Sequence, residues 1–308
     1  MTFIKINQRS SLKVNTFAPT VCLMERDYSS ISPSAKALLL MKGLTSIPFA
    51  HEAAMLWCGK DALNETQKRV DEEAFLLRLI HFENRYWSVS ALLDEFGQSN
   101  VLEMSSGFSF RGLDKAIAAQ NTVYTDTDLP DIIEMKKTLT RELLQRDGFD
   151  LRGKLFMQAL NALDEAAFDQ VLELFPPGPL TIVNEGLLVY LDEREKRHLL
   201  SIIHKVLKEK GGCWITGDVY IKTEREIGNA HDDFSDFLKK HNIDDNKFED
   251  FGQAESFFNS CGFEVIKKIV TIPEKLTAAR YLKPETIAKF QKPEARVRMH
   301  ETWAVKPM

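Results

Sequence analysis

Carboxylates stand where short apolar runs end at three places in the chain. These are Glu103, the pair Asp126 and Asp128, and Glu185. The carboxyl ends of parallel strands meet at one edge of a sheet, where α/β proteins bind their ligands. Acidic side chains at that edge can hold the hydroxyl groups of a ribose or the ammonium group of an amino acid. We therefore take these four residues as candidates for binding a small molecule.

The turn over residues 105–112 consists mostly of small residues between an apolar run and a helix-like pattern. A dinucleotide site needs Gly-x-Gly-x-x-Gly, so that the backbone can approach a pyrophosphate closely. The corresponding positions hold Ser105, Gly107 and Phe110, and the two missing glycines disfavour pyrophosphate binding. A P-loop is also disfavoured, because Leu113–Asp114 replaces its Lys-Ser/Thr pair. The turn favours a different cofactor, with an ordinary strand-to-helix turn as the alternative.

Asp126 and Asp128 end the next apolar run, about 20 residues beyond Gly107. An acidic side chain at this spacing binds both hydroxyls of an adenosine ribose. The alternative for Asp128 is that it caps the next helix, in whose first turn Pro130 is at home. Considered together with the first turn, the pair favours ribose binding.

Two further strand ends carry polar residues. Asn161 and Asp164 follow the third apolar run, where a small polar side chain can hydrogen-bond an adenine edge or simply cap a helix. Glu185 and Gly186 follow the fourth run and have apolar residues on both sides. These flanks disfavour an ordinary surface turn, so Glu185 is a candidate for binding an ammonium group near the reacting atoms.

Alternating strands and helices must position these side chains. We predict strands at Asn100–Met104, Thr122–Thr125, Leu155–Leu160, Leu180–Asn184, Gly212–Thr216, Phe263–Ile269 and Val297–Val305. We predict helices between them at residues 112–119, 129–146, 164–174, 192–210 and 252–261. This alternation predicts an α/β fold with a doubly wound, mostly parallel seven-stranded sheet. The long proline-containing connection before the last strand predicts a terminal antiparallel pair.

Helices and a polar insertion flank this core. Helical patterns at residues 34–42, 51–59 and 67–95 precede the first strand. The polar insertion 221–251 follows the fifth strand, on the side where loops commonly cover a ligand.

Composition limits the classes of partner. The chain has 308 residues with a net charge of −5 and no basic stripe, which argues against nucleic acid. Its apolar runs are too short to span a bilayer. Cys22, Cys58, Cys213 and Cys261 form no Cys-x-x-Cys pair and are expected to be reduced. We expect a cytoplasmic protein without a metal site, and the oligomeric state is left open.

The four strand-end motifs in order resemble the leucine carboxyl methyltransferase family, especially its bacterial branch similar to polyketide-tailoring O-methyltransferases. The family's first turn, Glu-Leu-Gly/Ala-Ala-Gly-Leu-x-x-Arg, is matched from Glu103 to Arg111. Its Asp-Leu-Pro is matched by Asp128–Pro130, and Lys136 follows in the expected helix. Its Glu-Gly-x-x-x-Tyr-Leu is matched by Glu185–Leu191.

The resemblance covers residues 75–220 and implies a class I methyltransferase that uses S-adenosylmethionine and releases S-adenosylhomocysteine. It also implies a Rossmann-like sheet whose seventh strand is antiparallel. A helical cap over residues 1–95 would precede a cofactor-binding domain over residues 96–308. We expect the cap and the insertion 221–251 to build the acceptor site.

The resemblance assigns five residues to the methionine end of the cofactor. Arg85 would bind the carboxylate, and Glu103, Ser105 and Gly107 would shape the pocket. Glu185 would face the amino group or the site of methyl transfer. Ser105 is a departure, because glycine is more frequent there in the family.

At the adenosine end the resemblance assigns Asp128, with Asp126, to the ribose. Asn161 and Ala162 would flank the adenine. Ser109 replaces an aspartate found in many members of the family.

The expected activity is methyl transfer to a hydroxyl or carboxylate of a small molecule. Only a hydroxyl acceptor requires a base, and the weak candidates are Tyr190, Asp218, Tyr220 and His231, each more often structural than catalytic. The alternatives are a methyltransferase for protein C-terminal carboxylates, a nicotinamide-dependent oxidoreductase, and a non-catalytic protein that binds the cofactor and a protein partner.

Overall fold

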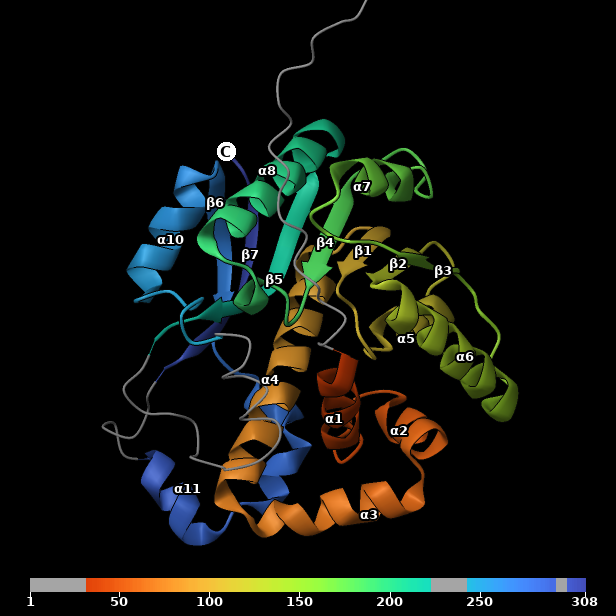
Figure 1. Cartoon of the computed structure of the whole chain (residues 1–308), viewed down its shortest axis with the longest axis vertical. Helices are drawn as coiled ribbons and strands as arrows, with labels where there is room; N and C mark the ends of the chain where they lie inside the picture. The colour runs from red at the N-terminus through yellow and green to blue at the C-terminus, as the bar shows by residue number, and fades with distance from the viewer. Residues whose placement is uncertain (1–31, 223–242, 292–297) are drawn as a thin grey trace, which may run out of the picture. The chain divides into compact units, whose positions relative to one another are not determined.

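A seven-stranded sheet organises the protein (Figure 1). The computed structural model describes residues 32–222, 243–291 and 298–308. The strand order is β3-β2-β1-β4-β5-β7-β6, and β7 is antiparallel to both of its neighbours while the other pairs are parallel. The strands are β1 (Asn100–Met104), β2 (Val123–Asp128), β3 (Lys154–Ala159), β4 (Leu180–Asn184), β5 (Gly212–Tyr220), β6 (Phe263–Ile269) and β7 (His300–Pro307). The predicted doubly wound sheet and its antiparallel terminal pair are confirmed.

The helices flank the sheet and extend beyond its carboxyl edge (Figure 1). They are α1 (Ser32–Lys42), α2 (Ala50–Cys58), α3 (Lys60–Lys68), α4 (Glu73–Phe96), α5 (Arg111–Ala118), α6 (Pro130–Asp147), α7 (Glu165–Leu172), α8 (Glu193–Lys210), α10 (Phe251–Ser260) and α11 (Pro284–Gln291). Short 3-10 turns are η2 (Arg69–Asp71), η3 (Leu188–Tyr190), η4 (Pro273–Lys275) and η5 (Thr277–Tyr281).

Two helix predictions need correction. The helix predicted over residues 67–95 is divided, because α3 ends at Lys68 and η2 precedes α4. The long connection after β6, in which no helix was predicted, contains α11, which begins at Pro284. Proline suits the first turn of a helix, where its missing N–H has no helical partner.

Strands β2 and β5 extend beyond their predicted ends. β2 continues through Asp128 and β5 through Tyr220. Aspartate and glycine are poor strand formers, so the local sequence favoured earlier ends. Pairing with neighbouring strands stabilises these extensions. Strand β2 pairs with β3 as far as Asp128. Strand β5 pairs with β7 again at Val219, after an irregularity that begins at Thr216.

Helix α4 joins the sheet to the helices that precede it in sequence. Near its carboxyl end, Val89 and Leu92 belong to a buried cluster with Ile215 of β5. Near its amino end, Phe75 and Leu79 belong to a second cluster shared with α1. Residues 31–308 form one compact unit, so the boundary predicted at residue 95 falls at the end of a helix that packs against both parts. No helix in the described part of the chain is both long and apolar enough to cross a bilayer.

A buried ion pair links β2 to α6. Lys136 Nζ lies 3.0 Å from Asp126 Oδ2, and both side chains are buried. The same ammonium donates a hydrogen bond to Ser106 Oγ at 2.9 Å. Burial raises the pKa of Asp126 to about 6, although Lys136 acts in the opposite direction. Lys136 therefore stabilises the ionised form of the Asp126 carboxyl group inside the fold.

Lys136→Met should lower the free energy of unfolding by about 3 kcal/mol, because it leaves Asp126 buried without its cation. Combining it with Asp126→Asn should recover most of this loss, since the remaining amide carries no charge. Urea unfolding at pH 7.5 of wild type, both single variants and the double variant measures the coupling. Additive losses would contradict the assignment of Lys136 as the partner of Asp126.

Candidate functional site

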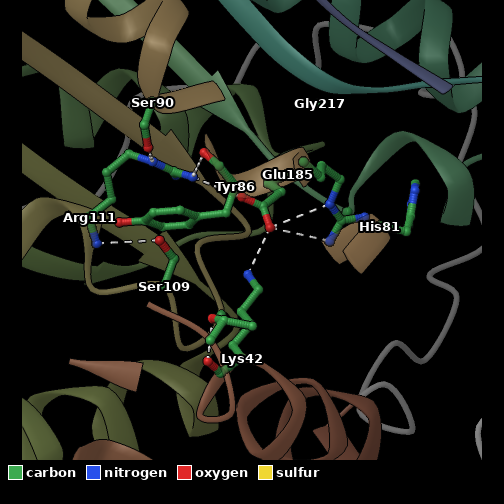
Figure 2. A network of polar contacts seen from close by, with 12 residues as sticks. Lys42, His81, Tyr86, Ser90, Ser109, Arg111, Glu185 and Gly217 are labelled. Carbon is green, nitrogen blue, oxygen red and sulfur yellow. Dashed lines mark hydrogen bonds and ion pairs between the residues drawn. The ribbon is translucent and has the colours of Figure 1, made fainter. Parts of the chain in front are cut away.

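The carboxylate of Glu185 lies at the centre of a buried cluster of charges (Figure 2). Glu185 follows the carboxyl end of β4. Lys42 Nζ donates to Glu185 Oε1 at 2.7 Å, and Arg111 Nη2 donates to Glu185 Oε2 at 2.8 Å. Arg85 lies 3.4 Å from Glu185 Oε1. Burial alone would raise the pKa of Glu185, but Lys42, Arg85 and Arg111 together hold it below its ordinary value.

Arg111 connects Glu185 to a second buried carboxylate. Its Nη1 donates to Glu103 Oε1, and the Tyr124 hydroxyl donates to Glu103 Oε2. Its Nε donates to Ser90 Oγ at 3.1 Å. Both oxygens of Glu103 are thus engaged within the fold, and the residue is fully buried. Glu103 therefore orients Arg111 and, through it, Glu185.

Arg85 is held more loosely by Glu185 than the other two cations are. Two of its nitrogens, Nε and Nη2, lie 3.4 Å from Glu185 Oε1. Arg85 Nη1 donates to the Tyr220 hydroxyl at the shorter distance of 3.0 Å. The buried Nε makes no hydrogen bond. Arg85 therefore retains a donor for an anion.

Asp218 holds the turn that carries Glu185. Its carboxylate accepts hydrogen bonds from the backbone N–H groups of Gly186, Leu187 and Leu188 at 2.6, 2.6 and 3.0 Å. The Asn184 side-chain amide adds a fourth bond at 2.6 Å. These contacts give Asp218 a structural role in place of the proton transfer for which the sequence makes it a candidate.

Tyr220, the hydrogen-bond partner of Arg85, contacts two histidines. His81 Nε2 lies 2.8 Å from the Tyr220 hydroxyl, and the rings of His300 and Tyr220 are 4.5 Å apart. His300 donates from Nε2 to the Gly217 carbonyl oxygen at 2.8 Å. Burial lowers the pKa of His300 to about 4, although its hydrogen bond to Gly217 acts in the opposite direction. His300 is therefore neutral at neutral pH.

The first turn and the end of β2 are joined directly. Gly107 N–H donates to Asp128 Oδ2 at 2.7 Å, and Leu129 N–H donates to Oδ1 of the same carboxylate at 2.7 Å. Leu129, not Asp128, is the N-cap residue of α6, and Pro130 occupies its first turn as predicted. The capping alternative for Asp128 is therefore wrong. Burial raises the pKa of Asp128, and the bonds from Gly107 and Leu129 lower it in part.

Ser105 and Gly107 both adopt left-handed backbone conformations, with φ of 49° and 48°. A residue with a Cβ is uncommon at such a φ, because the side chain crowds the backbone. This explains in physical terms why glycine suits position 105. A Cβ added at Gly107 would meet no atom within 4 Å, so the turn has open space on that side.

The end of β3 offers polar atoms of a different kind. Asn161 is exposed, and its Oδ1 accepts from Leu163 N–H at 3.1 Å. Ala162 beside it is buried. Asp164 caps α7 by accepting from Ala167 N–H at 3.0 Å, which confirms the capping alternative for this residue.

The structure divides the predicted site residues into separate groups. Arg85, Glu103 and Glu185 belong to the charged cluster, and Gly107 and Asp128 contact one another. Ser105 shares the turn of Gly107, and Asn161 and Ala162 follow β3. Asp126 does not share the contacts of Asp128: its buried carboxylate pairs with Lys136, whereas Asp128 accepts hydrogen bonds from the turn.

The remaining base candidates occupy different settings. Tyr190 is half-buried in η3, and Tyr220 ends β5 beside Arg85. His231 and much of the predicted insertion lie outside the described residues.

Lys42 and Arg111 are the residues that sequence reasoning did not assign to the site. Lys42 ends α1, where a basic residue is ordinary because it suits the helix dipole. Arg111 matched the family pattern of the first turn, and that match was the signal that could have identified it. Its contact with Glu185 spans 74 positions in sequence and could not be read from spacing.

Comparisons with known proteins support the fold. No protein-family model and no curated protein matches the sequence. A DUF574 family protein from Streptomyces avermitilis superposes with a TM-score of 0.51 at 15% identity, covering 88% of this chain and 97% of that one. The mitomycin 7-O-methyltransferase MmcR superposes with a TM-score of 0.45 at 12% identity, covering 92% and 69%. The chain spans only 43% of a structure described as a pericyclic reaction enzyme, at 8% identity and a TM-score of 0.43.

The chain has the class I methyltransferase fold. The strand order and the antiparallel β7 define it, and the superposition on the Streptomyces protein agrees with it. At these identities the likeness concerns the fold.

Ser105→Gly should raise the free energy of unfolding by about 0.5–1 kcal/mol, because glycine adopts a positive φ without the steric cost that serine bears. Thermal and urea unfolding measure the change. Ser109→Gly is the matched control, since Ser109 has no positive φ and its Oγ accepts from Arg111 N–H. The free energy of unfolding of Ser109→Gly should fall. If it falls in Ser105→Gly as well, the backbone strain assigned to Ser105 is contradicted.

His300→Gln should reduce the loss of stability on acidification. The pKa of His300 is about 4 in the fold, below the ordinary value, so the unfolded chain binds the proton more tightly and stability falls as pH falls from about 6.5 to 4. Glutamine can still donate to Gly217 but does not titrate. Between pH 7.5 and 5.0, urea unfolding should show wild type losing about 2 kcal/mol more than the variant. Equal losses would contradict the depressed pKa.

Proposed function

We propose that the protein is an S-adenosylmethionine-dependent O-methyltransferase that acts on a small molecule. The observation that carries this proposal is the cluster of Lys42, Arg85 and Glu185 at the carboxyl edge of a class I methyltransferase sheet. A carboxylate beside two cations matches the charges of an amino-acid group, which carries one ammonium and one carboxylate.

The first turn and the end of β2 fit the adenosine end of this cofactor. Gly107 presents open space where a side chain would otherwise stand, so a ligand can approach its backbone. Asp128 is only partly buried and is fixed by two backbone N–H groups. A carboxylate has about four lone-pair sites, so two bonds leave acceptors for ribose hydroxyls. Asn161 is exposed at the adjacent strand end, where adenine would lie.

The charged cluster fits the methionine end. Glu185 is the acceptor for an ammonium group, and its low pKa keeps it ionised. Arg85 supplies donors for a carboxylate, because its buried Nε is without a hydrogen bond. Lys42 lies beside it on the same oxygen of Glu185. The residues present therefore match both charges of the amino-acid group.

These residues would catalyse by positioning. When bound, S-adenosylmethionine supplies a methyl group already activated on a sulfonium sulfur. The contribution of the chain is to hold the methionine end rigidly while an acceptor approaches in line. Charges fixed in the fold before binding lose little energy to reorganisation. Asp218 and Glu103 provide that rigidity by fixing the turn of Glu185 and the guanidinium of Arg111.

The acceptor is proposed to be a hydroxyl or carboxylate of a small molecule, as the resemblance to the leucine carboxyl methyltransferase family implies. Of the three positions where a dinucleotide fingerprint has glycine, only Gly107 is glycine in this chain. This also disfavours the nicotinamide alternative, whose pyrophosphate needs a glycine-rich turn.

Wild-type protein should bind S-adenosylhomocysteine with a Kd on the order of micromolar in isothermal titration calorimetry. Asp128→Asn should weaken this binding about tenfold or more, because the amide offers fewer acceptors to ribose hydroxyls. Asp131→Asn is the matched control, since Asp131 is exposed in the first turn of α6, and it should bind as wild type does.

Absence of heat and of a thermal shift with S-adenosylhomocysteine would refute the proposed function. Quenching or enhancement of NADH fluorescence in the same protein would then indicate the oxidoreductase alternative.

A further inference from the structure

We propose that Tyr220 is a positioning residue that fixes Arg85 for an anionic group, and that His81 holds the Tyr220 hydroxyl in place. This inference rests on the proposed function, because the anionic group is the carboxylate of the cofactor. It gives Tyr220 a task different from the proton transfer considered for it from the sequence.

Tyr220 is the firmest partner of the Arg85 guanidinium. The Tyr220 hydroxyl accepts from Arg85 Nη1 at 3.0 Å, whereas both contacts with Glu185 measure 3.4 Å. Hydrogen bonds between charged groups are normally shorter than 3 Å. Glu185 also receives Lys42 and Arg111 at 2.7 and 2.8 Å, so its oxygens are shared. Tyr220 therefore sets the orientation of the Arg85 guanidinium.

The last residues of β5, from Gly217 to Tyr220, pack along the Arg85 side chain. A Cβ added at Gly217 would lie 3.2 Å from Arg85 Cγ and 2.9 Å from Val89 Cγ2, so the glycine lets the stem of Arg85 lie against the strand. Three residues later, Tyr220 meets the head of the same side chain. His300 fixes both ends of this segment by its bond to the Gly217 carbonyl and its ring contact with Tyr220.

His81 completes the chain of hydrogen bonds. Arg85 can only donate, so the Tyr220 oxygen accepts from it and the Tyr220 proton is directed to His81 Nε2 at 2.8 Å. We assign His81 the tautomer with its proton on Nδ1. Burial lowers the pKa of His81 and raises that of Tyr220 to about 12, so both groups are neutral near pH 7. This order of donors fixes the rotation of the Tyr220 hydroxyl and leaves its oxygen facing Arg85.

Removing the Tyr220 hydroxyl should therefore affect only ligands that carry the anionic group. Without it, Arg85 keeps its 3.4 Å contacts with Glu185 and its packing over the Phe82 ring, neither of which fixes the guanidinium through a short hydrogen bond. The first turn follows β1 and Asp128 ends β2, and both keep the hydrogen bond that joins them. The effect is expected on the carboxylate end of the cofactor and not on its adenosine end.

The test compares two ligands by isothermal titration calorimetry on the full chain. S-adenosylhomocysteine carries the amino-acid group, and 5′-methylthioadenosine lacks it. Tyr220→Phe should weaken S-adenosylhomocysteine about tenfold and leave 5′-methylthioadenosine unchanged. Tyr281→Phe is the matched control, because it removes a tyrosine hydroxyl that accepts from the exposed Arg280 at 2.7 Å. Its affinities for both ligands should equal those of wild type.

A second pair of variants tests His81. His81→Gln keeps a side-chain acceptor for the Tyr220 proton, whereas His81→Leu removes it. His81→Leu should weaken S-adenosylhomocysteine severalfold, and His81→Gln should restore much of the affinity.

The following outcomes separate the proposals. A wild-type protein that binds neither ligand refutes the proposed function. Wild-type binding of S-adenosylhomocysteine that Tyr220→Phe leaves unchanged overturns the positioning role alone. Equal weakening of both ligands also overturns it, since that indicates a general loss of structure. In a Tyr220→Phe and Arg85→Lys double variant, a loss smaller than the sum of the single losses supports it, and additive losses contradict it.

Discussion

The buried carboxylate of Glu185 is the interaction on which the arrangement of the site depends. Moving an ion from water into a protein costs several kcal/mol, and this cost is offset only by close partners of opposite charge. Glu185 follows β4, and its partners Lys42, Arg85 and Arg111 come from α1, α4 and α5. One carboxylate thus joins four elements that are far apart in sequence. Its removal would take from Lys42 and Arg85 the carboxylate with which they pair and would leave Arg111 to Glu103, so the fold around the site and its charges form together.

Acidic residues at neighbouring strand ends have different tasks because their surroundings differ. Glu103 is fully buried, with one oxygen bound by Arg111 and the other by Tyr124, so it acts through Arg111. Asp218 accepts four hydrogen bonds from the turn of Glu185 and its neighbour Asn184. Asp128 is only half-buried and keeps acceptor capacity toward its open side. The sequence alone does not separate these roles, and the contacts distinguish the carboxylates engaged within the fold from Asp128, for which we propose a role toward the cofactor.

The sequence predicts the sheet well and the charged cluster only in part. Strands β1, β4 and β6 have the predicted ends. The extensions of β2 and β5 were missed, since their stability comes from pairing with β3 and β7 and from the partner of Asp126 on α6. The break before α4 was missed because the sequence there contains neither glycine nor proline. Lys42 was unpredictable for a related reason: its contact spans 143 positions, and nothing in its own helix marks it.

The first turn shows why missing glycines must be interpreted with care. Ser105 and Gly107 have nearly the same positive φ, although only one of them is glycine. The path from β1 into α5 and the bond from Gly107 to Asp128 impose this geometry, and the serine bears a modest steric cost to adopt it. The loss of a glycine therefore does not abolish the turn. It changes what can approach the backbone, because a side chain now occupies one position while the other stays open. A pyrophosphate is thus disfavoured by restricted access to the turn, and the same turn remains compatible with a ligand that approaches through Gly107 alone.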